Sequence, residues 1–189
     1  MIMKKRASNG FTMIEIVLVI VIAGIIGSMA ASLLYQGAEM YVGETNRQGF
    51  VSEARSAFWR LMRTTQGQSS PDDFISSSNS QINVKNAKND SLIFLAASNG
   101  ELKISKDGGS NYNFLSKSLQ YSISNGFSFY NSSFGLITPS MGGLTNMEAE
   151  NVYLPKLDFI FVQDGDTLTL SSFVYPLNFR YGKKMSYHN

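Results

Sequence analysis

An uninterrupted apolar run near the N-terminus constrains this chain more than any other feature. Residues 16–38 carry no charged side chain, and a single carboxylate, Glu15, stands at the front of the run. As a helix, these 23 residues rise about 35 Å, enough to cross a bilayer core of about 30 Å. A carboxylate inside such a span costs about 2.5–3.5 kcal/mol on insertion scales. The sequence therefore predicts a membrane span in which Glu15 has a partner or a purpose.

A basic cluster precedes the apolar run. Lys4, Lys5 and Arg6 lie close to the N-terminus, whereas the first basic residue after the run is Arg47. The cytoplasmic flanks of membrane helices carry an excess of Lys and Arg. We therefore expect the leader, residues 1–10, to stay in the cytoplasm and the remainder of the chain to lie across the membrane.

The helical pattern continues beyond the apolar run. No proline occurs before Pro71, so nothing forces the helix to end at the membrane face. Farther along, apolar side chains recur at spacings of three and four residues, which is the period of one helix face. These side chains are Phe50, Val51, Ala54, Phe58, Leu61 and Met62. The sequence therefore predicts one long helix, with a transmembrane part over 11–38 and an amphipathic continuation over 39–66.

The remainder, residues 67–189, is rich in strand and turn signals. Polar, glycine and proline residues indicate a loop over 66–80, a long surface segment over 134–146 and a loosely ordered tail over 181–189. Short apolar or alternating runs between turn residues predict antiparallel strands. The predicted strands are 82–84, 92–97, 102–104, 119–123, 127–130, 157–162 and 167–174. The expected fold is therefore α+β, with the long N-terminal helix packed on an antiparallel β-sheet domain.

Composition excludes several chemistries. Cysteine is absent and the single histidine is His188 in the polar tail, so the usual triads lack a nucleophile or base and no enzyme is expected. Without the three basic leader residues, 13 Lys and Arg face 14 Asp and Glu. Such a neutral body lacks the basic stripe of a nucleic-acid-binding protein, so no nucleic-acid partner is expected.

Aspartates in three places raise the question of calcium. They are the turn Asp164-Gly165-Asp166, the pair Asp72-Asp73, and Asp107. A calcium site needs about six to eight converging oxygen ligands, whereas a hairpin turn alone accounts for the first group. No cofactor is expected, and calcium stays open as an alternative.

The aromatic residues allow two interpretations. Trp59 on the helix fits either packing or contact with a partner. Phe127, Phe129 and Tyr130 fit either an exposed adhesive surface or the core of a sheet. We expect the core, because large aromatic side chains are mostly buried.

The N-terminal residues resemble those of a known protein family. The basic cluster, Gly10, Phe11, Thr12, Glu15 and the long apolar helix occur together as they do in type IV prepilins and in the pseudopilins of type II secretion. The resemblance covers the N-terminal region of the chain. It implies that a membrane prepilin peptidase cuts between Gly10 and Phe11 and methylates the new N-terminus.

The resemblance also implies a purpose for Glu15. Cleavage creates a cationic amine on Phe11, which a carboxylate at a similar depth in a neighbouring helix would neutralise. Glu15 would then set the register of subunits in a helical filament whose core is formed by residues 11–38. The implied partners are other pilin or pseudopilin subunits, prepilin peptidase, an inner-membrane assembly platform and membrane lipid. The implied location is the inner membrane, single-pass with a periplasmic or extracellular domain, and then the pilus or pseudopilus.

The membrane segment also bears on the subtype. Major pilins of the family often carry a proline within this segment, where the present chain has Gly24, Gly27 and Ser32. The helix and its continuation over 48–63, followed by a Ser-Pro loop, resemble more closely those of minor pilins, such as the mannose-sensitive haemagglutinin type, and of J-type minor pseudopilins. The leading hypothesis is a minor pilin or pseudopilin that helps to initiate or cap a filament.

Two other interpretations stay open. One is a binding protein at a filament tip, acting through its loops as an adhesin or in DNA uptake. The other is a Sec-exported protein, cut near the small residues Ser28-Met29-Ala30 to leave an N-terminus near Ser32. The apolar core of an ordinary signal is about 7–15 residues long and has no carboxylate, which disfavours the second interpretation.

Overall fold

The computed structural model describes residues 10–86, 88–122 and 125–177. The leader cluster Lys4-Lys5-Arg6, the tail over 181–189 and His188 within it lie outside the described residues.

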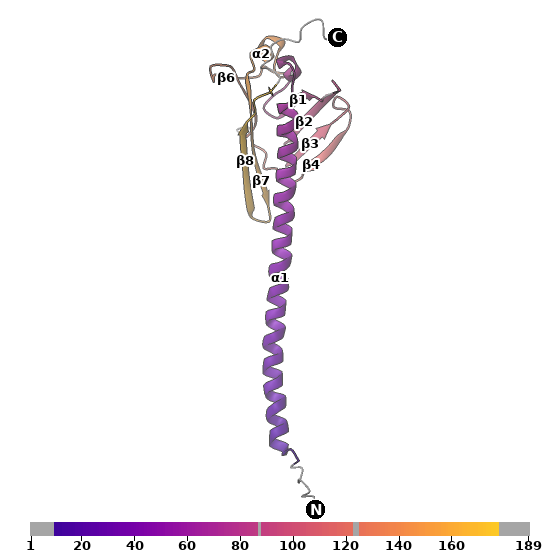
Figure 1. The fold of residues 1–189 in the computed structure, drawn as a ribbon, viewed down its shortest axis with the longest axis vertical. Coiled ribbons are helices and arrows are strands. Elements are labelled where there is room, and N and C mark those ends of the chain that lie inside the picture. Colours follow the sequence, from indigo (N-terminus) through magenta and orange to yellow (C-terminus); the bar gives the residue numbers. More distant parts are fainter. Residues whose placement is uncertain (1–9, 87, 123–124, 178–189) are drawn as a thin grey trace, which may run out of the picture. The chain divides into compact units, whose positions relative to one another are not determined.

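The long helix α1 extends over Met13–Gln66 (Figure 1). Its 54 residues include no proline, so every backbone N–H beyond the first turn can bond within the helix. The prediction of one continuous helix is confirmed. The chain forms two compact units, residues up to Asn46 and residues from Arg47 on, and α1 contributes to both.

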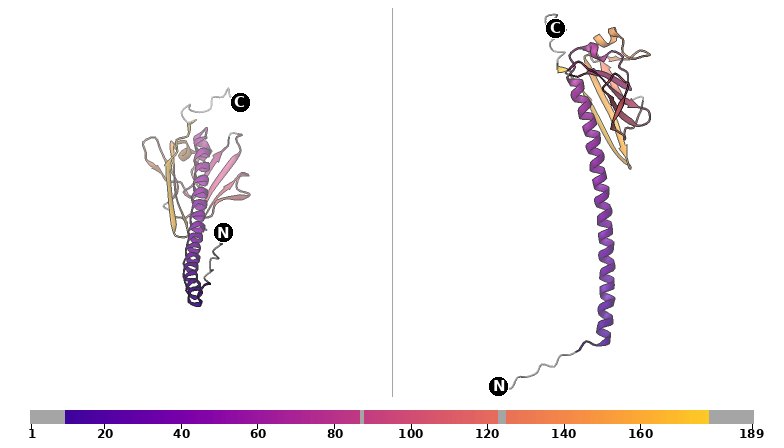
Figure 2. Two further views of the ribbon diagram at one scale, coloured as in Figure 1. Left: turned by 60° about the horizontal axis from the view of Figure 1, so that its bottom comes forward. Right: turned by 90° about the vertical axis from the view of Figure 1, so that its right-hand side faces the viewer.

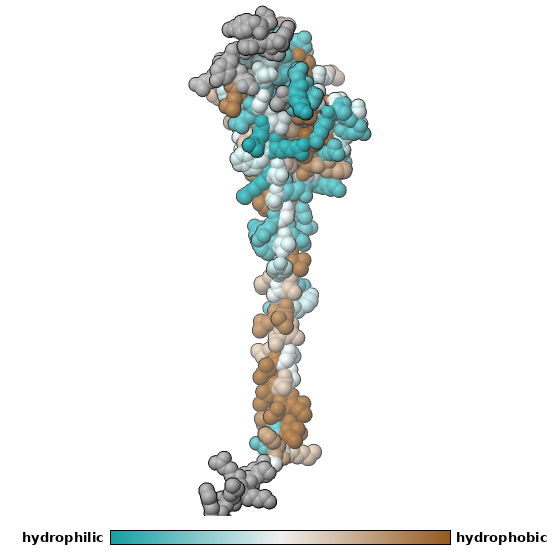
Figure 3. All heavy atoms as spheres, turned by 45° about the vertical axis from the view of Figure 1, so that its right-hand side comes forward, coloured by the Kyte–Doolittle hydropathy of each residue, from teal (hydrophilic) through white to brown (hydrophobic). Residues whose placement is uncertain are grey.

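In the first unit, α1 is exposed on all sides. Every residue from Gly10 to Asn46 is exposed, including large apolar side chains such as Leu18 and Leu34, which are 57% and 75% exposed. Figure 3 shows apolar residues gathered along this part of the helix. By length and composition α1 can cross a membrane. Because an apolar surface this extensive is unfavourable in water, it needs lipid or other proteins around it.

In the second unit, two antiparallel four-stranded sheets flank the remainder of α1 (Figures 1 and 2). The first sheet, in the order β1-β2-β3-β4, consists of Gln81–Lys85, Ser91–Ala97, Glu101–Ser105 and Tyr112–Ser116. The second, in the order β6-β5-β7-β8, consists of Leu136–Ile137, Gly126–Tyr130, Leu154–Gln163 and Asp166–Phe173. A 3-10 helix, η1, spans Pro71–Phe74, and a short helix, α2, spans Asn146–Glu150.

One face of α1 joins the two sheets into a single core. The buried residues of the helix are Phe50, Ala54, Ala57, Phe58, Leu61 and Thr65, so the amphipathic stripe is confirmed. Phe58 meets Phe159 of β7 edge-on, with 6.4 Å between the ring centroids. Ile82, Phe94 and Ile104 of the first sheet belong to the same cluster. The helix is therefore the central element that both sheets need in order to bury their inner faces.

All predicted strands except one are confirmed, with ends shifted by a few residues. The β7–β8 turn has positive φ at both central residues, 51° at Asp164 and 89° at Gly165. A two-residue hairpin turn of type I′ requires this geometry and favours Asp-Gly. The strands form two sheets, where the sequence pattern indicated only an antiparallel sheet domain.

The predicted strand over 119–123 is wrong. In the described part of this segment, Leu119 and Ser122 make only isolated bridges, with Phe161 and Asn125. A strand requires a run of residues paired with one neighbour. Alternation of apolar and polar residues does not supply that neighbour.

Four short elements are not apparent from the sequence pattern: β4, β6, η1 and α2. The helix η1 lies within the expected loop over 66–80, and α2 begins where the expected loop over 134–146 ends. Each begins with a capping box, Ser70 with Asp73 and Thr145 with Glu148. That signal was readable from the spacing. The strands β4 and β6 are edge strands whose side chains are exposed or half-buried except at Ser116, so they lack a clear apolar alternation.

Candidate functional site: the start of the long helix

The segment from Gly10 to Glu15 forms the entry to α1. Glu15 Oε2 accepts hydrogen bonds from the N–H and Oγ1 of Thr12, both at 3.2 Å, and Thr12 Oγ1 accepts from the Glu15 N–H at 3.4 Å. These reciprocal bonds form a capping box, which satisfies backbone donors that the first helical turn leaves free. The spacing Thr-x-x-Glu ahead of an apolar run was a readable signal that the sequence interpretation above does not use.

The capping box uses only one oxygen of Glu15. Within the described part of the chain, Oε1 has no hydrogen-bond or ion-pair partner. A carboxylate in the first turn also interacts favourably with the helix dipole. Glu15 therefore helps to start the helix of its own chain and still presents an oxygen to a group from outside.

The Gly10–Phe11 bond lies in open surroundings. A Cβ at Gly10 would meet no atom of the chain within 4 Å, and Gly10 is not among the glycines with positive φ. Phe11 is 77% exposed. The chain's own structure therefore does not require glycine at this position.

The apolar run ends at Glu39, which is also bonded within the helix. Its Oε1 accepts a hydrogen bond from Tyr35 Oη at 2.8 Å. The acidic residues that border the run, Glu15 and Glu39, therefore both have partners on α1. Between them the helix presents apolar and small side chains alone, apart from a few hydroxyl and amide groups.

The Asp107 carboxylate organises the β3–β4 turn. Its Oδ1 accepts from Ser105 Oγ at 2.7 Å and from the Asn111 N–H at 2.9 Å, and its Oδ2 accepts from Asn111 Nδ2 at 2.6 Å. These hydrogen bonds, first that from Ser105, stabilise the charged form and lower the pKa of Asp107 to about 2.

Other aspartates considered for calcium also have structural partners. The buried carboxylate of Asp73 accepts from the N–H groups of Ser69 and Ser70, both at 3.2 Å, and lies 3.2 Å from Lys85 Nζ. Asp166 lies 3.4 Å from Arg47. Among the described residues, no three His, Cys, Asp or Glu side chains gather closely enough to hold a metal ion. The expectation of no cofactor stays a prediction, with calcium as its alternative.

The aromatic residues named in the sequence analysis differ in how far they are buried. Phe127 and Phe129 are 1% and 0% exposed, so their placement in the core is confirmed. Tyr130 is half-buried and packs edge-on against Phe173, with 5.4 Å between the ring centroids. Trp59 is 57% exposed, which favours contact with a partner over packing.

Comparison with known families identifies the N-terminal segment. Residues 5–31 match the family model of the prokaryotic N-terminal methylation motif, a range that contains Gly10, Phe11 and Glu15. The match indicates a pilin- or pseudopilin-type protein, and the proteins that carry this motif are structural rather than enzymatic. Together, the motif and the exposed apolar helix support membrane anchoring. No curated protein and no solved structure matches the chain.

Proposed function

We propose that this chain is a minor pilin or pseudopilin that helps to initiate or cap a type IV pilus or a type II secretion pseudopilus. One observation carries the proposal: the methylation motif leads into a helix whose apolar residues over 16–38 are all exposed. Such a helix has to be covered. Lipid covers it while the subunit is anchored, and the helices of neighbouring subunits cover it after assembly.

Processing comes before assembly in this proposal. Prepilin peptidase cuts between Gly10 and Phe11 on the cytoplasmic side, where Lys4, Lys5 and Arg6 hold the leader, and methylates the Phe11 amine. The open space around Gly10 supports this order, because glycine is not needed there for folding. A peptidase that approaches the backbone closely would reject a side chain at this position.

Assembly then depends on Glu15. The cut leaves a positive amine one residue before the capping box, and Oε1 of Glu15 is open to an amine from another subunit. In the low dielectric of packed apolar helices, an unpaired charge is costly and a paired one much less so. The pair therefore sets the register between neighbouring subunits. An inner-membrane assembly platform extracts the subunit, and the second compact unit lies in the periplasm and later on the filament.

A second candidate is a binding protein at the filament tip. Large apolar side chains are exposed around β6 and α2 in the second unit: Phe134, Leu136, Met141 and Met147 are 69%, 62%, 105% and 77% exposed. Exposed apolar groups of this kind favour contact with another molecule. Deleting the gene separates the candidates, because loss of filaments supports the initiating subunit, whereas normal filaments with reduced adhesion or DNA uptake support the tip protein.

Mass spectrometry of the mature N-terminus is the most direct test of the proposed function. We expect a chain that begins with N-methylated Phe11. A chain that begins near Ser32 would indicate an ordinary secretion signal and contradict the proposal.

The Glu15→Val variant tests the assembly step. It should remain anchored and processed, because the apolar helix and the Gly10–Phe11 bond are unchanged, but it should be incorporated poorly into filaments. Normal incorporation of this variant would refute the register argument.

A further inference from the structure

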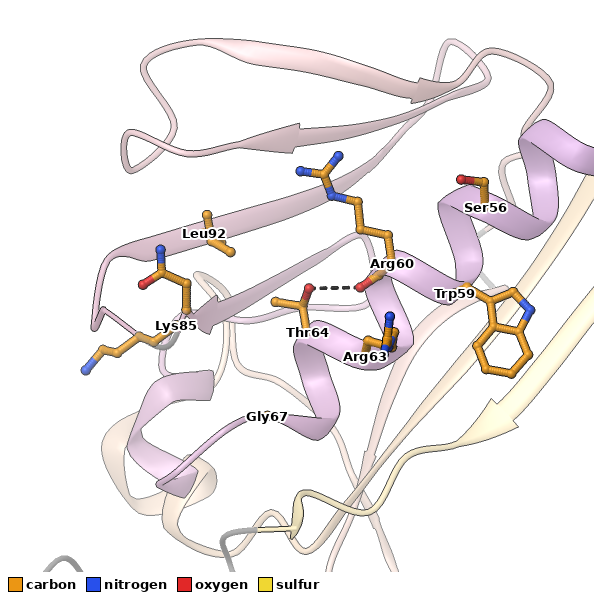
Figure 4. A pocket seen from close by; sticks show the side chains of 9 residues that line it. Ser56, Trp59, Arg60, Arg63, Thr64, Gly67, Lys85 and Leu92 are labelled. Carbon is orange, nitrogen blue, oxygen red and sulfur yellow. Dashed lines mark hydrogen bonds between the residues drawn. The ribbon is translucent and has the colours of Figure 1, made fainter.

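An open cleft of about 670 Å³ lies between the last turns of α1 and the β1–β2 hairpin (Figure 4). Trp59, Arg60, Arg63 and Thr64 line it from α1, and Lys85 and Leu92 line it from the strands. Figure 4 shows the Arg60 side chain extending toward the strands. The cleft belongs entirely to the second unit and is separate from the start of the helix.

The cleft is positively charged, and two of its three cationic side chains have no acidic partner among the described residues. No acidic side chain lines it. In the described part of the chain, the guanidinium groups of Arg60 and Arg63 have no hydrogen-bond or ion-pair partner. Their backbone carbonyls accept hydrogen bonds, that of Arg60 from Thr64 Oγ1 at 2.8 Å and that of Arg63 from the Gly67 N–H at 3.2 Å. Lys85 differs, because the nearly buried carboxylate of Asp73 lies 3.2 Å from its Nζ. Two free guanidinium groups one helical turn apart can bind paired carboxylates.

The composition of the cleft is typical of a protein-binding surface. Trp and Arg are enriched among residues that dominate binding energy at interfaces, and here Trp59 lies beside two arginines. The ring of Phe114, another exposed aromatic residue of the second unit, lies 5.2 Å from Lys103 Nζ and 4.8 Å from Lys117 Nζ. The Trp59 indole N–H, by contrast, has no bonded partner among the described residues.

Several anions fit a positive cleft, and the structure favours a short acidic peptide segment. The volume exceeds that of a single small anion and falls in the usual range of ligand sites, about 300–1,000 Å³. A nucleic acid usually requires a longer basic track with several aromatic platforms. Here one tryptophan and three cations are confined to the last turns of α1 and the adjoining hairpin, on a body of nearly neutral charge.

The chain itself displays a segment of the required chemistry. The narrow β7–β8 turn, Asp164-Gly165-Asp166, carries two carboxylates, and Asp166 lies 3.4 Å from Arg47 at the beginning of the packed part of α1. Arg60 lies thirteen residues farther along the helix, about 20 Å at 1.5 Å per residue. The acidic turn and the basic cleft therefore lie at opposite ends of the packed helix. Contacts between opposite ends of subunits are head-to-tail contacts, which generate open helical assemblies.

We propose that the Arg60–Arg63 cleft docks a carboxylate-bearing turn of a neighbouring subunit in the filament. This inference rests on the proposed function. It adds a second contact, between the globular parts of subunits, to the contact made by the apolar helices.

Fluorescence of Trp59, the only tryptophan in the chain, provides a direct reading of the cleft. The mature full-length chain in detergent micelles is titrated with a synthetic peptide of residues 162–168. We expect a saturable change in fluorescence that weakens as salt is raised. The same peptide with Asp164→Asn and Asp166→Asn should bind about tenfold more weakly, the factor expected from losing about 1.4 kcal/mol of charged contacts.

Two variants locate the binding. The double variant Arg60→Ala and Arg63→Ala should weaken binding of the acidic peptide about tenfold. The control Arg55→Ala removes an exposed arginine of the same helix that does not line the cleft, and it should bind like the unchanged chain. Equal binding of the acidic and the neutral peptide, or no saturable change, overturns the proposal. Tighter binding of inorganic phosphate or of an oligothymidylate also overturns it, in favour of a simple anion or a nucleic acid.

Incorporation into filaments separates this inference from the proposed function. The charge-reversed variant Arg60→Glu and Arg63→Glu should be processed normally but incorporated several-fold less than the unchanged chain. Both positions are exposed, so the fold should survive, and an unfolding curve checks this. If this variant is incorporated normally while Glu15→Val is excluded from filaments, the docking role of the cleft is overturned and the proposed function is unaffected. Normal incorporation of both variants overturns the function itself.

Discussion

The two parts of α1 contrast in composition and in exposure. Leu33, in the first unit, is 68% exposed, whereas Leu61, in the second, is 0% exposed. The more apolar part is the more exposed one, which inverts the rule for helices in water. A helix that is apolar all round is suited to lipid or to other apolar helices, whereas a helix with one apolar stripe is suited to docking on a domain. The contrast teaches that the pattern of apolar residues, more than their number, indicates what surrounds a helix.

The largest expected effect comes from truncating matched leucines on the two sides of this contrast. Leu61→Ala leaves a cavity in the core and should lower the free energy of unfolding of the second unit by about 2–5 kcal/mol. Leu33→Ala should leave that unfolding transition unchanged, because Leu33 belongs to the first unit. Denaturant unfolding of the full chain in micelles measures both. Equal destabilisation by the two variants would contradict the contrast between the exposed and the packed part of α1.

A smaller effect is expected at the start of the first unit. Thr12→Ala removes both side-chain bonds of the capping box and should destabilise the first helical turn by about 1 kcal/mol. Thr45→Ala is the matched control, because its Oγ1 bonds only to the Tyr41 carbonyl within the same unit. Hydrogen exchange of the amides over 13–16 provides the measurement. Unchanged exchange in Thr12→Ala would show that the Thr12 side chain does not cap the helix.

Low pH should weaken the β3–β4 turn of the second unit by protonating Asp107. The pKa of Asp107 lies at about 2, below its usual 3.8, so the charged form is favoured by folding. The resulting contribution to stability is complete above about pH 4 and is lost as the pH falls through about 2. The chemical shift of the Asn111 amide should titrate with a midpoint near that lower value. A midpoint at the usual value would mean that the hydrogen bonds to Asp107 are absent in solution.

The smallest effect is expected where the second unit begins. The ion pair of Arg47 with Asp166 is exposed on both sides, 61% and 43% of each side chain, so Arg47→Ala should cost about 0–1 kcal/mol and less at high salt. Denaturant unfolding at low and high salt measures this cost. A loss of stability comparable to that of Leu61→Ala would mean that the packed part of α1 begins before Arg47.

Local signals were sufficient to predict α1 and most strands. The spacing of Phe50, Ala54, Phe58 and Leu61 predicted which face of the helix is buried, because helix periodicity depends on neighbours within one or two turns. The residues around Gly10 and Glu15 predicted the match to the N-terminal methylation motif for the same reason, since all parts of the motif are close in sequence.

Features that depend on distant residues could not be predicted in this way. The division of the strands into two sheets depends on which strands pair, and alternation at Leu119 gave a strand where only a bridge to Phe161 exists. The cleft joins Arg60 to Lys85, which are far apart along the chain, so only the folded structure brings them together. The capping boxes, unlike these features, join residues three apart, so their spacing was readable from sequence alone.

The capping box at the start of α1 would remain intact through the proposed processing step. Thr12 and Glu15 both lie on the mature side of the Gly10–Phe11 bond, so cutting that bond leaves every hydrogen bond of the box in place. The proposed cut would therefore remove the leader and create a terminal charge without breaking a hydrogen bond of the box. Because peptide hydrolysis is not reversed in the cell, the proposed cut would commit the subunit to its new N-terminal charge while the start of the helix stays capped.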